Sequence, residues 1–201
     1  MDAFFQGHGE LTLRCETGTD LYRRPGKSFN NATVRTVPTS SGGFAASVYV
    51  TVAQLSGEYQ QAGLVFAVDS SALTDGSSEN AAWIKAGVER WHGSLRASVV
   101  VTRAGVSDWS VADFALFNSD TSRLDSSASV GFTVRIVRAA DASIVVEMKD
   151  AASDSDSDGW VLLRKTYAWS SAPALVGVMC AAPEQGPAFD AHFSAFKLLQ
   201  S

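Results

Sequence analysis

The sequence predicts an all-β protein built as a sandwich of sheets, and three observations support this prediction. Short runs rich in Val, Ile, Phe, Trp and Thr recur along the chain, bounded by clusters of Gly, Ser, Asp and Asn. Most of these runs alternate apolar and polar residues with period two, as strands with one buried face do. No segment has the apolar period of a helix of normal length, although residues 107–117 have helical spacing and could form one short helix.

The strand-like runs follow one another along nearly the whole chain. They cover residues 11–15, 44–53, 59–69, 82–91, 95–103, 130–138, 144–149, 160–168, 175–182 and 189–199. His92-Gly93-Ser94 and Asp158-Gly159 are typical of tight hairpin turns. Residues 70–80 form the longest loop of small polar residues. Because no repeat and no linker divides the chain, we expect one domain over residues 1–201.

Composition narrows the classes of partner. The chain has 201 residues and a net charge of -5, from 16 Lys+Arg against 21 Asp+Glu. This acidity argues against nucleic acid and an anionic membrane surface, which both require a basic footprint. The first residues do not resemble a signal peptide, so we expect a cytoplasmic location. Cys15 and Cys180 are expected to be buried free thiols.

Alternation also predicts which side chains face the core. In residues 59–69, Ala62, Leu64, Phe66 and Val68 form the apolar set, and in residues 83–91 the set is Ile84, Ala86 and Val88. The opposite face of the second run carries Trp83, Lys85, Gly87 and Glu89. A slip of one residue would bury both charges. Gly63 and Gly87 lie on this polar face and suggest a depression in the sheet.

Six short motifs together resemble one known family. In chain order they are Gly18-Thr19-Asp20-Leu21-Tyr22-Arg23, Gln61-Ala62-Gly63-Leu64, Trp83-Ile84-Lys85-Ala86-Gly87-Val88-Glu89, Val99-Val100-Val101-Thr102-Arg103, Ser107-Asp108-Trp109-Ser110 and Gly177-Val178-Met179. The chain resembles the small concanavalin-A-like sandwich family, mostly of unknown function, that includes the yeast regulator of enolase. The resemblance implies a concanavalin-A-like jelly-roll sandwich of two antiparallel sheets with a concave face. Relatives on this fold bind or hydrolyse carbohydrate, but a fold does not determine a function.

The usual catalytic and metal-binding patterns are missing from the sequence. Glu89 is the only carboxylate at the centre of the polar face, whereas a glycosidase needs a pair. The histidines are scattered, and there is no Gly-x-Ser-x-Gly elbow. Residues 154–159 begin like a calcium loop, but Lys165 stands where the twelfth-position Glu belongs. We therefore expect no metal and no cofactor.

Eight residues are the candidate ligand contacts. Arg135 is expected to pair with Glu89 or to meet an anionic ligand. Trp83, Trp91, Tyr59 and Tyr22 are expected to line a concave surface, whereas Trp109 and Trp160 are expected to anchor the core or hairpins. The complete set is Asp20, Tyr22, Gln61, Trp83, Lys85, Glu89, Asp108 and Arg135.

Three classes of function remain open at this point. The favoured hypothesis is a non-catalytic ligand-binding or regulatory module that meets a sugar, a small metabolite or a metabolic enzyme. The alternative is a metal-independent isomerase, cyclase or hydrolase in which Glu89, Lys85 and Asp20 act as acid/base or orienting groups. The third class is a protein-interaction scaffold whose polar face is merely solvated.

Overall fold

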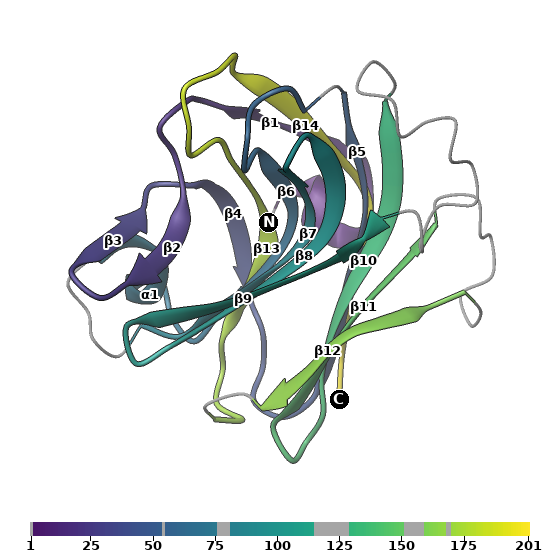
Figure 1. Cartoon of the computed structure of the whole chain (residues 1–201). Coiled ribbons are helices and arrows are strands. Elements are labelled where there is room, and N and C mark those ends of the chain that lie inside the picture. The colour runs from purple at the N-terminus through teal and green to yellow at the C-terminus, as the bar shows by residue number, and fades with distance from the viewer. Residues whose placement is uncertain (1, 54, 76–80, 115–128, 151–158, 168–169) are drawn as a thin grey trace.

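Two six-stranded antiparallel sheets pack face to face in the computed structural model of the chain (Figure 1). The structure describes residues 2–53, 55–75, 81–114, 129–150, 159–167 and 170–201. A separate two-stranded hairpin lies against the outer face of one sheet. The predicted concanavalin-A-like jelly-roll sandwich is confirmed.

The elements are assigned to the sheets as follows. The first sheet has the order β1 (Glu10–Cys15), β14 (Phe189–Gln200), β5 (Phe44–Val52), β10 (Val130–Arg138), β11 (Ser143–Asp150) and β12 (Val161–Tyr167). The second has the order β4 (Thr33–Pro38), β13 (Leu175–Ala181), β6 (Gln61–Ala67), β7 (Trp83–Trp91), β8 (Ser94–Arg103) and β9 (Val106–Asp113). The hairpin consists of β2 (Leu21–Arg24) and β3 (Lys27–Asn30), and the described residues also form the helical turns η1 (Ala3–Gln6) and α1 (Ser71–Thr74).

The predicted strands are confirmed with small shifts at their ends, and the differences have physical reasons. Residues 107–117 do not form a helix over their described part, because β9 pairs in register with β8 along its whole length. Pairing with a neighbour therefore overrides the local helical spacing. β2, β3 and β4 were not predicted from the sequence. The first two are short, rich in charge and joined by Pro25-Gly26, so they lack the apolar alternation of a typical strand.

The tight turn at residues 92–94 is confirmed. His92 and Gly93 both have positive φ, at 49° and 75°, as the two central residues of a type I′ hairpin require. The carboxylate of Glu58 accepts hydrogen bonds from both backbone N–H groups. The calcium-like run at 154–158 and the Asp158 side of the other predicted hairpin lie outside the described residues.

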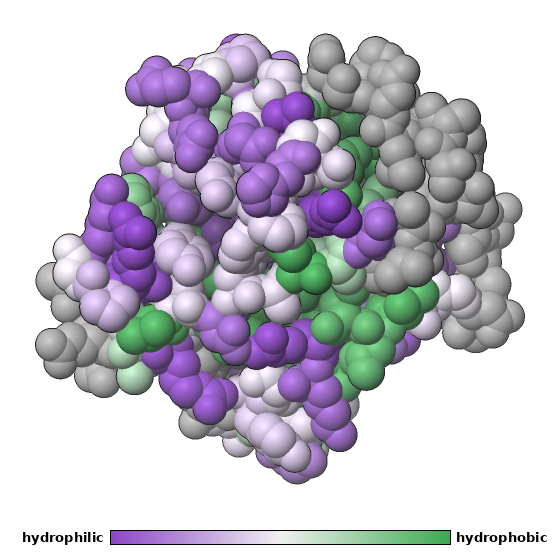
Figure 2. Space-filling view, in the orientation of Figure 1, coloured by the Kyte–Doolittle hydropathy of each residue, from purple (hydrophilic) through white to green (hydrophobic). Residues whose placement is uncertain are grey.

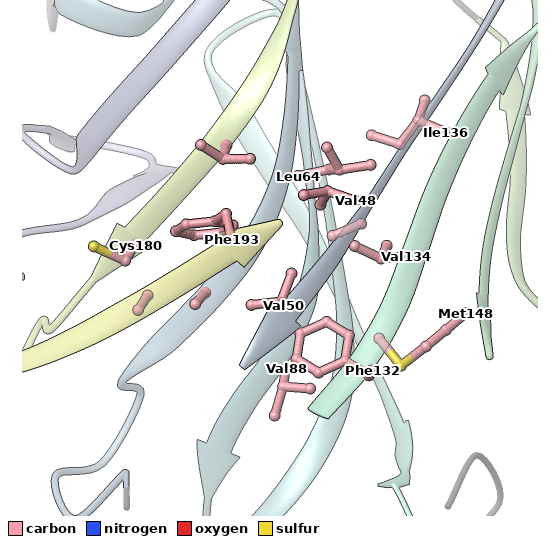
Figure 3. Packing of buried hydrophobic residues seen from close by; sticks show 14 of the residues in the cluster. Val48, Val50, Leu64, Val88, Phe132, Val134, Ile136, Met148, Cys180 and Phe193 are labelled. Carbon is pink, nitrogen blue, oxygen red and sulfur yellow. The ribbon is translucent and has the colours of Figure 1, made fainter. Parts of the chain in front are cut away.

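The core between the two sheets contains the side chains that alternation predicts. Leu64 and Val88 of the second sheet pack in one cluster with side chains of the first sheet, including Val50, Phe132 and Val134 (Figure 3). Cys15 and Cys180 are free and buried in this core, as predicted. Val68 is the exception, because it packs on the outer face of the second sheet and not in the main core.

A second apolar cluster covers part of that outer face. The hairpin and α1 contribute Leu21, Ala72 and Leu73, which pack against side chains projecting from the sheet: Val65, Ala67, Trp83, Val100, Met179 and Ala181. As a result, β6 is buried on both faces along its whole length. This cover leaves the rest of the outer face available for the cavity described below.

Gly63 and Gly87 face each other as a cross-strand pair in the middle of the second sheet. A Cβ atom added at Gly87 would lie 2.0 Å from the carbonyl oxygen of Ala62, and one at Gly63 would lie 2.0 Å from that of Ala86. The two glycines therefore allow the backbones of β6 and β7 to approach closely. The predicted depression above them is only about 10 Å³, so their main role is in backbone packing.

Gly87→Ala should destabilise the protein by about 1–3 kcal/mol, because the new methyl group meets backbone atoms that cannot move aside. Gly186→Ala is the matched control, since its Cβ would lie 3.5 Å from the Cα of Gly57 in ordinary contact. This control should change the free energy of unfolding by less than about 0.5 kcal/mol. Urea unfolding measures the free energy of unfolding of both variants. If Gly87→Ala is as stable as Gly186→Ala, the close approach of the two backbones is contradicted.

Candidate functional site

A cavity of about 470 Å³ lies between the β2–β3 hairpin and the outer face of the second sheet. In Figure 2 the hairpin forms the hydrophilic left side of the molecule, beside a hollow over the sheet. The lining residues belong to the hairpin, to the second sheet, to residues just before β2 and β6, and to the segment after β13. They are Asp20, Tyr22, Arg24, Lys27, Phe29, Tyr59, Gln61, Lys85, Glu89, Val100, Trp109, Pro183 and Glu184.

An ion pair joins the entry of the hairpin to the floor of the cavity. Lys85 Nζ, from the middle of β7, donates to Asp20 Oδ1 at 3.1 Å, and the two side chains are only 5% and 11% exposed. Asp20 Oδ1 also accepts a hydrogen bond from the backbone N–H of Leu21. The side chain of Asn31 accepts from the backbone N–H of Asp20, which fixes this residue at the start of β2.

Glu89 is the second buried carboxyl group on the floor. Its Oε2 accepts hydrogen bonds from Ser98 Oγ at 2.6 Å and from Trp109 Nε1 at 2.9 Å. Burial raises the pKa of the Glu89 carboxyl above its usual value, and the positive charge of Lys85 opposes this only in part. The cavity therefore contains a carboxyl group that keeps its proton to a higher pH than an exposed glutamate does.

Aromatic rings form the walls around these charges. Trp109 packs edge-on against Trp91 at 5.5 Å and against Tyr59 at 6.2 Å between ring centroids. Tyr59 has a φ of 59°, which is uncommon for a bulky residue and marks a locally constrained backbone. On the hairpin side, Lys85 Nζ lies 5.9 Å from the centroid of the Tyr22 ring.

The structure brings five of the predicted site residues to one cavity: Asp20, Tyr22, Gln61, Lys85 and Glu89. Gln61 lies directly opposite Glu89 in the pairing of β6 with β7, and its side chain donates to the backbone carbonyl of Tyr59. Alternation along two neighbouring strands was sufficient to predict that these two side chains share a face.

Trp83 projects to the same side of the sheet but does not line the cavity. It is fully buried in the second apolar cluster beneath the hairpin and α1. Its indole N–H has no hydrogen-bond partner among the described residues. The face of Trp83 was predicted correctly, but its role is to pack the cover and not to contact a ligand.

Arg135 and Asp108 are placed elsewhere, and both predictions are corrected. Arg135 lies on β10 of the other sheet, where its Nε donates to Glu147 Oε2 at 2.6 Å and its guanidinium stacks on Trp160 at 4.0 Å. It therefore cannot pair with Glu89. Asp108 lies on β9, on the opposite face of the strand from the cavity residue Trp109, and forms an ion pair with Arg164.

Trp109 lines the cavity, although the sequence predicted only that it would anchor the core or a hairpin. In the pairing of β8 with β9, Trp109 lies opposite Val100, a residue that alternation already directs away from the core. Ala104 and Gly105 have positive φ, at 48° and 74°, and form the tight turn between these strands. Recognising this turn would have placed Trp109 on the polar face.

Neither a metal centre nor a membrane span is found in the described part of the chain. No group of three or more His, Cys, Asp or Glu side chains there is arranged to hold a metal ion. None of the described helices is long and apolar enough to cross a membrane.

Comparisons with known proteins agree with the fold. The family model described as "Protein of unknown function (DUF1349)" matches residues 3–201. No curated protein matches the chain. A functionally unknown protein from Saccharomyces cerevisiae is 25% identical, with a TM-score of 0.74, over 96% of this chain and 89% of the yeast chain. The predicted resemblance to a small sandwich family of mostly unknown function is confirmed.

More distant structures share the fold alone. The GH43 protein BlXynB from Bacillus licheniformis is 16% identical with a TM-score of 0.61; the match covers 98% of this chain but only 34% of that one. LamAcat from Zobellia galactanivorans is 11% identical with a TM-score of 0.51, over 96% of this chain and 78% of the other. At these identities the site residues cannot be transferred, so the cavity must be interpreted from its own side chains.

The raised pKa of Glu89 predicts how stability depends on pH. The folded state holds the Glu89 proton more tightly than the unfolded state, whose glutamate pKa is about 4.3. Between this pH and the higher pKa of the folded state, the ionisation of Glu89 therefore lowers the free energy of unfolding as pH rises. Glu89→Gln removes that loss. Unfolding free energies measured between about pH 4 and about pH 8 should therefore shift in favour of the variant as pH increases. A difference that is constant with pH would contradict this.

Proposed function

The chain belongs to this family of unknown function, and we propose that it is a ligand-binding module that holds a small polar molecule, of carbohydrate size, between the hairpin and the sheet. The main observation in support of this proposal is that three buried charged side chains line one cavity. Asp20, Lys85 and Glu89 are all buried residues, and all three line it.

The size and lining of the cavity support a small-molecule ligand. A volume of about 470 Å³ is within the range of about 300–1,000 Å³ for such sites. Sites of this kind combine apolar walls with a few convergent polar groups. Here the walls include Tyr22, Phe29 and Trp109, while Gln61 and Glu89 provide an amide and a carboxyl group.

The cost of the buried charges is a further argument for a binding role. A buried ion pair rarely stabilises a fold more than well-packed apolar side chains of similar volume would. Lys85 and Asp20 lie beside an apolar cluster that could have continued over them. A ligand that needs oriented donors and acceptors explains why this part of the sheet is charged.

Carbohydrates fit this combination of groups better than purely apolar molecules do. Sugar rings present apolar faces that stack on aromatic side chains, and hydroxyl groups that both donate and accept hydrogen bonds. The cavity supplies acceptors at Glu89 and Asp20 and a donor at Lys85. The proposal rests on these groups and not on the fold shared with the GH43 protein.

The second candidate function is metal-independent acid–base catalysis in the same cavity. The specific observation that favours it is the raised pKa of Glu89, since a general acid must hold its proton near neutral pH. Lys85 and Asp20 would orient the substrate or stabilise charge. Product analysis after incubation with each bound ligand separates this function from binding alone. The cavity itself gives less support to a scaffold with a flat, solvated face.

A matched pair of tryptophan variants tests the binding site. A thermal-shift screen of monosaccharides and disaccharides, followed by calorimetry, should first identify a ligand. Trp109→Phe removes the N–H that donates to Glu89 and reduces the stacking surface, so affinity should fall by about tenfold, or about 1.4 kcal/mol. Trp160→Phe alters the outer face of the other sheet and should leave affinity unchanged. Equal losses in both variants would place the site elsewhere.

A further inference from the structure

We propose that the cavity is selective for ligands that carry a primary ammonium group, with amino sugars as the ligand class, and that this group binds at Glu89. This inference rests on the proposed function and specifies which polar molecule the same site prefers. It follows from the charges on the floor, the partners of the Glu89 carboxyl and the rings that surround it.

The floor has one carboxyl group more than it has cations. Lys85 Nζ forms its ion pair with Asp20 and not with Glu89. Arg96 lies opposite Glu89 in the pairing of β7 with β8, but its guanidinium forms an ion pair with Asp113. When all three groups are ionised, Asp20 and Lys85 compensate each other and the charge of Glu89 remains. A buried charge is normally paired, because isolated burial is costly. The floor therefore lacks one cation.

The hydrogen bonds of Glu89 show where that cation can bind. Ser98 and Trp109, both neutral donors, are directed at Oε2. No described residue donates to Oε1, although Glu89 lines the cavity. An ammonium group has three N–H donors and no acceptor, so it complements this oxygen better than a hydroxyl group does. A charge-assisted hydrogen bond is also about twice as strong as a neutral one.

The aromatic walls favour the same charge. Tyr22, Phe29, Tyr59 and Trp109 all line the cavity. The protein's own ammonium groups already lie against two of these rings, with Lys27 at 4.7 Å from the Phe29 centroid and Lys85 at 5.9 Å from Tyr22. The negative faces of aromatic rings attract cations, and the attraction increases when water is excluded.

The other charges around the cavity lie at its rim. Arg24 and Lys27 project from the hairpin, and Glu184 lies beyond β13; all three are exposed. Water and salt screen charges in such positions, whereas the buried floor is screened much less. The floor therefore determines which charge the innermost group of the ligand carries, and the rim cations remain available to solvent-exposed parts of the ligand.

Protonation of Glu89 predicts a pH signature. An ammonium group requires the carboxylate form, so affinity should fall as pH decreases through the raised pKa of Glu89. It should fall again at high pH, where the amine of the ligand loses its proton. A neutral sugar has no charge to pair with Glu89, so its affinity should depend less on pH.

Calorimetry with three sugars of the same ring tests the proposal. Glucosamine, glucose and N-acetylglucosamine differ at one substituent, which is an ammonium, a hydroxyl and a neutral amide. Other aminohexoses, with the amine at different ring positions, are titrated alongside. Near neutral pH we expect the best amino sugar to bind at least about tenfold more tightly than its neutral counterparts, equivalent to about 1.4 kcal/mol.

Two variants connect this preference to Glu89. Glu89→Gln should reduce the preference for the amine to less than about twofold while a neutral sugar still binds. Glu147→Gln removes a carboxylate on the other sheet, paired with Arg135, and should keep the wild-type preference. If Glu89→Gln does not fold, the ratio of amine to neutral affinity in the wild-type protein, measured as pH is lowered, replaces it and should decrease.

The outcomes separate the two proposals. If neutral sugars bind as tightly as amino sugars, or if Glu89→Gln keeps the preference, the amine inference is wrong and the binding function stands. If no sugar of either kind binds, both the amine inference and carbohydrate binding are wrong.

Discussion

The buried ion pair between Lys85 and Asp20 is the interaction on which the rest of the site depends. It joins the middle of β7 to the residue that begins the hairpin, so the cover and the floor are held at one point. Removing one partner of a buried pair leaves an uncompensated charge, which typically costs about 3–5 kcal/mol. The same pair compensates the charge of Asp20, so Glu89 is left as the carboxyl group on the floor with an oxygen, Oε1, that accepts no hydrogen bond from a described residue. The pair therefore determines both the shape and the charge of the cavity.

The outer face of the second sheet is divided between two tasks. At one end, Trp83, Val65 and Ala67 pack beneath the hairpin and α1 as a small second core. At the other end, Gln61 and Glu89 face the cavity. Because β6 and β7 are buried on both sides, their backbones have little freedom, and the polar side chains they carry are held in place. Such preorganisation lowers the cost of ordering side chains when a ligand binds.

The fold and the site give different kinds of information about this protein. The sandwich is shared with proteins of different size, including a GH43 protein of which it spans only about a third. The carboxyl, ammonium and aromatic groups that line the cavity come from the hairpin, the second sheet and the segments next to them. A function can be inferred from these groups and not from the fold. Glu89 is central to both candidate functions, since a carboxyl group in the cavity can hydrogen-bond a bound ligand and, with its raised pKa, can also deliver a proton.

The sequence by itself determined most of the strands, the sandwich and, with the exception of Val68, the direction of side chains along the strands it predicted. Alternation is local, so it correctly placed Gln61, Lys85 and Glu89 on one face. Only the tertiary structure decided which strands share a sheet, because pairing joins residues far apart in sequence. It placed Arg135 in the other sheet and brought Trp109 and the unpredicted hairpin over Glu89. Trp83 was directed to the correct side, but what covers a face depends on packing, which no local pattern encodes.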